Sequence, residues 1–198
     1  THDLEIRGAG ELLGEEQSGQ IQAIGYSLYM DLLARAVEAM RAGRIVEPEL
    51  ALRPALEINL RVPALIPEDY LPDVHNRLIM YKRIASAVSD EELHRIEVEM
   101  IDRFGLIPPP TRTLMRIARL RVAVRPLGIG KIEASASGGL VEFAAQTSVD
   151  PLTIVDLVQH DPRRYRLDGG TRLRFIEATE GVEPRIACVE RLLTRLAT

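Results

Sequence analysis

The first residues with a chemical signature form a glycine-rich motif, DLEIRGAGELLGEEQSG, at positions 3–19. Its glycines permit the tight turns and close backbone approach that a phosphate-binding loop needs. Their G-x-G-x-x-x-G spacing differs from the dinucleotide fingerprint, and no Gly-Lys-Ser/Thr follows to supply a P-loop lysine. Glu11, Glu15 and Glu16 would also repel phosphate. The motif therefore predicts a shaped loop without a bound nucleotide.

The histidines and the cysteine are not spaced as in a metal-binding or catalytic site. The four histidines are scattered, at positions 2, 75, 94 and 160, without the spacing of a metal-binding helix. The single cysteine, Cys188, stands between Ala187 and Val189, which favours a buried apolar role over a nucleophile. Adjacent acids such as Glu91 and Glu92 suit the first turn of a helix. The sequence thus predicts no catalytic residue and no metal site.

Arginines concentrate in residues 105–130, which hold five arginines and no acid. Arg112, Arg116 and Arg119 share one face of a predicted helix, because steps of four and three return to the same side. This basic face has two interpretations: a strip that binds nucleic acid, or a surface that pairs with acidic helices of the same chain. The lack of interleaved aromatic residues favours the intramolecular interpretation.

Acids concentrate in the preceding segment, where residues 68–104 carry nine acids and five lysines or arginines. Glu92, Glu99 and Asp102 fall on one side of a predicted helix. The opposite side of that helix is apolar and consists of Leu93, Ile96, Met100 and Phe104. A charged helix face of this kind is usually solvated, but it also suits docking of a partner that presents arginines.

Hydrophobic periodicity indicates the elements that position these side chains. A four-residue repeat over 24–40, ended by Gly43, predicts a helix of about twenty residues. The polar, proline-bearing segment 44–55 predicts a domain boundary. Further helices are expected over 74–88, 90–104, 111–124, 151–158 and 184–196.

Strict alternation of apolar and polar residues predicts the strands. A strand is expected over 56–62, one hairpin over 129–143 with a Gly138-Gly139 turn, and a second hairpin over 165–176. Strands joined by hairpins and kept apart from a run of helices predict the α+β class. The expected architecture is a small sheet of hairpins with helices packed on it, preceded by a loop-helix segment.

Composition narrows the class of protein. A hydrophobic content of 46% supports a real core, and a net charge of −4 argues against a surface built as a whole to hold phosphate backbones. One cysteine, no long apolar run and no secretory signal lead us to expect a cytoplasmic protein without a membrane partner. The chain begins at Thr1 and reaches a dense motif by Asp3, so we expect a piece of a longer protein.

Several long motifs resemble the bacterial transcription-repair coupling factors, the Mfd family. They are DLEIRGAGELLGEEQSG, IGYSLYMDLLARAV, LPDVHNRLIMYKRIA, EMIDRFGLIPPPTRTLMRIARLR, GGLVEF and YRLDGGTRL. The resemblance covers essentially the whole chain. It implies that residues 1–50 are the end of the motor module, with a translocation motif like that of RecG-type helicases and a long helix. Residues 51–198 would be the C-terminal TRCF regulatory domain.

The resemblance also implies a function that composition does not reveal. In that family an ATP-dependent translocase on double-stranded DNA removes stalled RNA polymerase and recruits nucleotide excision repair through UvrA. ATP and Mg would bind upstream, so this chain would hold no cofactor and have no enzyme activity of its own. The translocation motif would use Arg7, Gly8, Gly10, Gly14, Gln17, Ser18 and Gly19.

The resemblance further implies that the C-terminal domain is autoinhibitory. It would act as a clamp on the N-terminal UvrB-like module of the same protein and mask the surface that UvrA binds. Glu99 and Asp102 are our choice for the carboxylates that pair with arginines of that module, because they lie one turn apart on the charged side of their helix. The alternative is a DNA-binding module that uses Arg112, Arg116 and Arg119.

Overall fold

The computed structural model describes residues 56–198, which form five α-helices and one five-stranded sheet. The strands are β1 (Glu57–Asn59), β2 (Ile129–Ser135), β3 (Gly138–Phe143), β4 (Tyr165–Asp168) and β5 (Arg172–Ile176). The helices are α3 (Val74–Ser86), α4 (Asp90–Phe104), α5 (Pro109–Val124), α6 (Pro151–His160) and α7 (Val182–Leu196), with a 3-10 turn, η2 (Arg125–Leu127). A run of helices followed by hairpins confirms the predicted α+β class.

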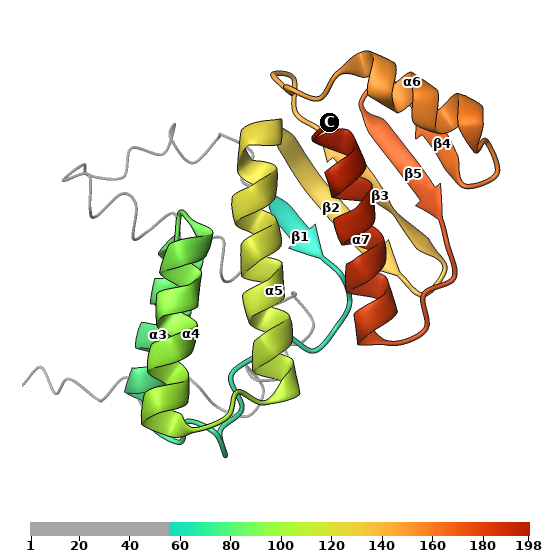
Figure 1. Ribbon diagram of the computed structural model, residues 1–198. Coiled ribbons are helices and arrows are strands. Elements are labelled where there is room, and N and C mark those ends of the chain that lie inside the picture. Colours follow the sequence, from blue (N-terminus) through green and yellow to red (C-terminus); the bar gives the residue numbers. More distant parts are fainter. Residues whose placement is uncertain (1–55) are drawn as a thin grey trace, which may run out of the picture.

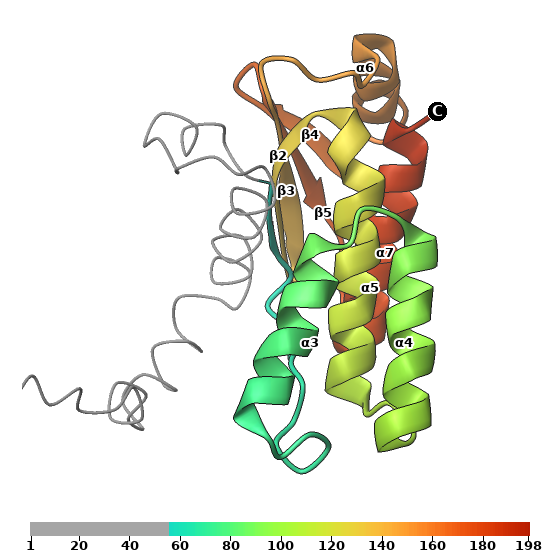
Figure 2. The same cartoon turned by 90° about the vertical axis from the view of Figure 1, so that its left-hand side faces the viewer.

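The sheet has the strand order β1-β2-β3-β5-β4, and all its neighbours are antiparallel except β1 and β2. One row of side chains across it is apolar, because Ile58 pairs with Ile132, Ile132 with Val141, and Val141 with Leu173. Helices α5 and α7 lie against this apolar face (Figures 1 and 2). The opposite face carries mainly charged residues, as the alternation in β2, β3 and β5 predicts.

Two buried clusters share helix α5. One cluster lies between the sheet and α7 and contains Leu120 and Val124 of α5. The other lies among α3, α4 and the first half of α5, and it contains Leu114, Met115 and Ala118. Ile117 packs against both clusters. Figure 1 shows the consequence, with α5 standing between the α3–α4 pair and α7.

The predicted helix boundaries rest on recognisable caps. The Ser89 side chain accepts the Glu92 N–H at the start of α4, and Gly105 ends this helix with φ of 89°. The Asp150 side chain accepts the Leu152 N–H and opens α6. Proline occupies the first turn of α5, where a missing N–H costs no helical hydrogen bond.

The turn of the first hairpin differs from the prediction. The sequence places it at Gly138-Gly139, whereas the structure puts the turn at Ala136-Ser137 and both glycines in β3. They are needed there because the strands approach closely: a Cβ on Gly139 would overlap the Glu133 carbonyl oxygen and lie 2.5 Å from the Phe175 ring. The two glycines therefore signal close packing rather than a turn.

Strand β1 is also shorter than predicted, three residues in place of 56–62. The Asn59 side chain accepts the Arg61 N–H, and Arg61 adopts a left-handed φ of 51°, so the chain turns away from the sheet. Strand β1 pairs in parallel with β2, because the chain between them crosses over through three α-helices.

The translocation motif, the predicted helix over 24–43 and the predicted boundary over 44–55 lie outside the described residues. Within 56–198, none of the helices combines the length and the apolar character needed to cross a membrane.

Candidate interaction surface

Helix α4 buries one side in the helical cluster and leaves another side exposed. Leu93, Ile96 and Met100 are buried in the helical cluster. Its C-terminal end is held by Tyr70, whose hydroxyl lies 3.2 Å from the Met100 carbonyl oxygen and 3.0 Å from that of Gly105. This anchoring keeps the outward side chains of the last two turns in a defined position.

The Glu99 carboxylate is bound by two arginines. Arg83 of α3 donates to both of its oxygens, at 2.9 and 2.6 Å, and Arg103, one turn further along α4, donates to Oε1 at 2.9 Å. These hydrogen bonds, first that from Arg83 and then that from Arg103, lower the pKa of Glu99 to about 2. Glu99 is therefore ionised over the whole physiological range and ties α3 to α4.

Asp102 lies on the solvent side of the same helix and is exposed. Its neighbours on this side include two apolar residues, Val98 at 43% and Ile101 at 41% exposure. Leu106, which follows the Gly105 cap of the helix, is 87% exposed. An apolar strip beside an exposed carboxylate is the composition of an interface core with a polar rim. We call Val98, Ile101, Asp102 and Leu106 the α4 outer face.

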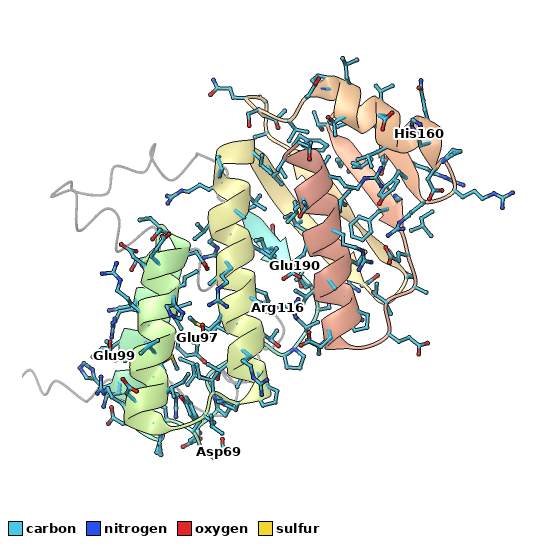
Figure 3. All side chains as sticks on the ribbon, in the orientation of Figure 1. Asp69, Glu97, Glu99, Arg116, His160 and Glu190 are labelled. Atoms are coloured by element: carbon cyan, nitrogen blue, oxygen red, sulfur yellow. The ribbon has the colours of Figure 1, made fainter. Side chains whose placement is uncertain are left out.

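The basic face of α5 is largely occupied by acids of neighbouring helices. Arg116 forms ion pairs with Glu183 and with Glu190 of α7, the latter at 2.7 Å, and Figure 3 shows Arg116 and Glu190 between the two helices. These partners raise the pKa of Arg116 above its usual value, chiefly through the hydrogen bond with Glu190. The structure thus follows the intramolecular interpretation at this position.

Arg119 makes the matching contacts on the other side of α5. Its guanidinium lies 2.8 Å from Asp90 and 2.5 Å from Glu97, both of α4. Arg112, the third member of the predicted strip, is exposed. The three arginines therefore share a helix face in sequence but divide between two helix interfaces and solvent in the structure.

Among the described residues weighed for catalysis, the histidines lie at the surface and the cysteine is buried. His75, His94 and His160 are exposed, and Figure 3 shows His160 on α6. Cys188 is 2% exposed, and its thiol donates to Glu177 Oε2 at 2.9 Å. Burial, followed by the Glu177 hydrogen bond, raises the pKa of Cys188 to about 11, which keeps it a thiol. Among residues 56–198, no group of histidines, cysteines and acids is arranged to hold a metal ion.

Sequence reasoning missed two features of this surface. It selected Glu99 to pair with arginines of the N-terminal module and did not anticipate its ion pair with Arg83 of α3, which only tertiary packing brings within reach. It also overlooked Val98 and Ile101, whose offset from the buried stripe of Leu93, Ile96 and Met100 marks them as exposed. The residues of the translocation motif lie outside the described part of the chain.

Comparison with known proteins gives a consistent result. The family of the TRCF domain matches residues 60–154. The transcription-repair-coupling factor of Escherichia coli is 53% identical over 99% of this chain and 17% of its own length. That of Haemophilus influenzae is 49% identical over 100% of this chain and also 17% of its own length. The chain therefore spans about a sixth of the length of these curated relatives.

A solved structure supports the fold independently. The crystal structure of the C-terminal domain of a transcription-repair coupling factor superimposes with a TM-score of 0.57 and 18% sequence identity, covering 72% of this chain and 94% of that one. The fold and the matched segment thus define an α+β TRCF domain. The chain belongs to the transcription-repair coupling factor family.

Proposed function

We propose that this domain regulates a larger ATP-dependent translocase of double-stranded DNA by docking on the UvrB-like N-terminal module of the same protein. In the docked state it masks the surface that UvrA binds. The parent would remove stalled RNA polymerase, and exposure of the masked surface would then recruit excision repair. The observation that carries the proposal is the α4 outer face, where an exposed apolar strip adjoins Asp102.

The chemistry of this face suits a reversible contact with an arginine-bearing surface. Val98 and Ile101 supply apolar area, which gives affinity without charge specificity. Asp102 offers an exposed carboxylate for a charge-assisted hydrogen bond. A pair of this kind at a polar rim contributes orientation and selectivity more than raw affinity, so the contact can be broken.

Glu99 lies beside the α4 outer face, one turn before Asp102, and would contribute to docking in a different way. A carboxylate has about four acceptor positions, and Arg83 and Arg103 use three of those on Glu99. One position on Oε2 remains for an arginine of the partner module. Glu99 therefore serves the docking contact and, through Arg83, holds α3 and α4 in register.

The ATP and Mg sites of the parent would lie upstream of this chain. We accordingly expect the isolated 198-residue chain to hydrolyse no ATP and to act only through its contact with the N-terminal module. The relatives are named transcription-repair-coupling factors, and this name supports a role of the parent protein in coupling transcription to repair.

The test uses the full-length protein. Asp102→Arg, alone and combined with Ile101→Ala, should raise UvrA binding about tenfold and increase ATP hydrolysis, because repulsion and lost apolar area release the clamp. Glu180→Ala removes an exposed acid from the loop before α7 and serves as the control; it should leave both values unchanged. Equal UvrA binding by wild type and the Asp102→Arg variants would reject the clamp.

The ion pairs of α5 with its neighbouring helices weaken the alternative of DNA binding by Arg112, Arg116 and Arg119. Phosphate binding by Arg116 or Arg119 would require breaking ion pairs with α7 or α4. Only Arg112 among the three is exposed without such a pair in the described chain. A salt-dependent mobility shift of DNA by the isolated chain, lost on Arg112→Ala, would restore this alternative.

A further inference from the structure

A second charged surface lies at the opposite end of the domain, on the hairpin of β4 and β5. Residues 161–176 carry five arginines and two aspartates, an excess of three positive charges in a chain whose net charge is −4. Arg166, Arg172 and Arg174 are all exposed. Their alternation with the buried Leu173 and Phe175 puts them on the face of the sheet opposite α5 and α7.

The register of this hairpin sets two of these arginines against each other. Arg166 of β4 pairs directly with Arg174 of β5, while Asp168 pairs with Arg172. Asp168 accepts a hydrogen bond from Arg174 at 2.9 Å. Like charges directly opposite in a sheet are destabilising, so folding alone gives no reason for the Arg166–Arg174 pair. Three arginines around one aspartate leave a local excess of positive charge that suits an anionic partner.

The backbone of β4 offers a second element of recognition. Strand β4 is the outermost strand of the sheet and pairs only with β5 among the described strands. The Ile176 N–H donates to the Arg164 carbonyl at 2.8 Å, so the alternation of an antiparallel pair places the next bonded pair at Arg166 and Arg174. The N–H and C=O of Leu167 then point to the outer edge. The Leu167 side chain is 49% exposed.

The chemistry of the partner follows from three features: the outer backbone edge of β4, the arginine at 166 and the exposed leucine at 167. An extended segment added beside β4 would place alternate side chains near Arg166 on one face and Leu167 on the other. Carboxylates fit the first position and apolar side chains fit the second. Nucleic acid fits less well, because Asp168 lies among the arginines and the only aromatic side chain of β4, Tyr165, is buried.

We propose that the β4–β5 hairpin is a docking site for an extended protein segment of alternating acidic and apolar residues, which adds to the β4 edge and pairs its carboxylates with Arg166 and Arg174. This site is separate from the α4 outer face. It would let the domain contact a second protein while α4 remains docked or after it is released.

The experiment measures binding of a fluorescein-labelled Glu-Val-Glu-Val-Glu peptide to the 198-residue chain by anisotropy. Arg166→Thr combined with Arg174→Thr should weaken binding about tenfold, since two charge-assisted contacts are lost. Leu167→Pro keeps all three arginines but removes the outward N–H, and it should weaken binding about as much if the peptide adds as a strand. Arg112→Ala, an exposed arginine on α5, is the control and should bind like wild type.

Two further probes separate this site from general charge attraction. A Glu-Glu-Glu-Val-Val peptide of the same composition should bind at least about fivefold more weakly, because its acids cannot all face the arginines. Unchanged affinity in the arginine variant, or equal affinity for the two peptides, would overturn the proposal. Tighter binding of a 12-base-pair duplex than of the alternating peptide, lost in the same arginine variant, would also overturn it and assign the hairpin to nucleic acid. Circular dichroism of each variant verifies its fold.

Discussion

At the scale of single residues, Glu99 shows how an ion pair makes stability depend on pH. Its folded pKa of about 2 lies below the value of about 4.3 expected in an unfolded chain. The stabilisation is therefore fully present above about pH 4.3 and is lost as the pH falls toward 2. Replacing Glu99 by Gln should lower the free energy of unfolding at pH 7. It should also reduce the loss of stability that acidification causes.

Urea unfolding at pH 7, 4 and 2.5 measures the effect. The difference between wild type and Glu99→Gln should be largest at pH 7 and shrink at pH 2.5, where the carboxylate is about one quarter protonated in the folded state and almost fully protonated in the unfolded chain. Asp102→Asn is the control, since it neutralises an exposed acid of the same helix. A difference that stays constant over the three pH values would show that the Arg83–Glu99–Arg103 contacts contribute nothing through charge.

Arg166 allows a prediction in the opposite direction, a gain of stability. Arg166→Glu turns the like-charge pair with Arg174 into a pair of opposite charge, so the free energy of unfolding should rise by about 0.5 kcal/mol. Arg163→Glu makes the same change of charge in the loop before β4 and should leave stability nearly unchanged. Urea midpoints at constant m-value measure both; destabilisation by Arg166→Glu would show that Arg166 has a structural role in the hairpin.

At the scale of elements, Gly139 determines whether β3 can lie close to its neighbours. A methyl group on Gly139 would meet the Glu133 carbonyl oxygen and the Phe175 ring, neither of which can move without disturbing the sheet. Gly139→Ala should therefore cost about 1–3 kcal/mol, as overpacking of a core does. Gly170→Ala, where a Cβ meets nothing within 4 Å, is the matched control. Thermal unfolding compares them, and equal melting temperatures would refute the steric argument.

The elements also show what a sequence can and cannot predict. Sequence patterns located the five described α-helices but not the 3-10 turn η2; Ser89 and Gly105 bound α4, and Asp150 opens α6. The glycines at 138 and 139 misled, because glycine permits both a turn and a close approach, and only the distant Phe175 decides between them. Arg83 and Glu99 are sixteen residues apart on separate helices, so their pairing depended on tertiary packing. The Arg166–Arg174 pair required the strand register, which composition does not contain.

At the scale of the whole molecule, helix α5 joins the two clusters into one folding unit. It supplies buried residues to both, and its arginines extend to both sides, Arg116 to α7 and Arg119 to α4. The two proposed docking surfaces lie on the two parts so joined, the α4 outer face on the helical part and the β4–β5 hairpin on the sheet. If α5 couples the two clusters rigidly, docking at one surface would fix the position of the other.

This connection predicts cooperative unfolding of residues 56–198. Met100 is fully buried in the helical cluster, and Met100→Ala should cost about 2–5 kcal/mol through the cavity it leaves. If α5 couples the clusters, hydrogen exchange of β2 and β3 amides should accelerate as much as that of α3 and α4 amides, because both open through the same global event. Val141→Ala in the sheet cluster gives the reciprocal test. Protection that falls only in the substituted cluster would mean that α5 separates two independently unfolding parts, and that the two surfaces can move relative to each other.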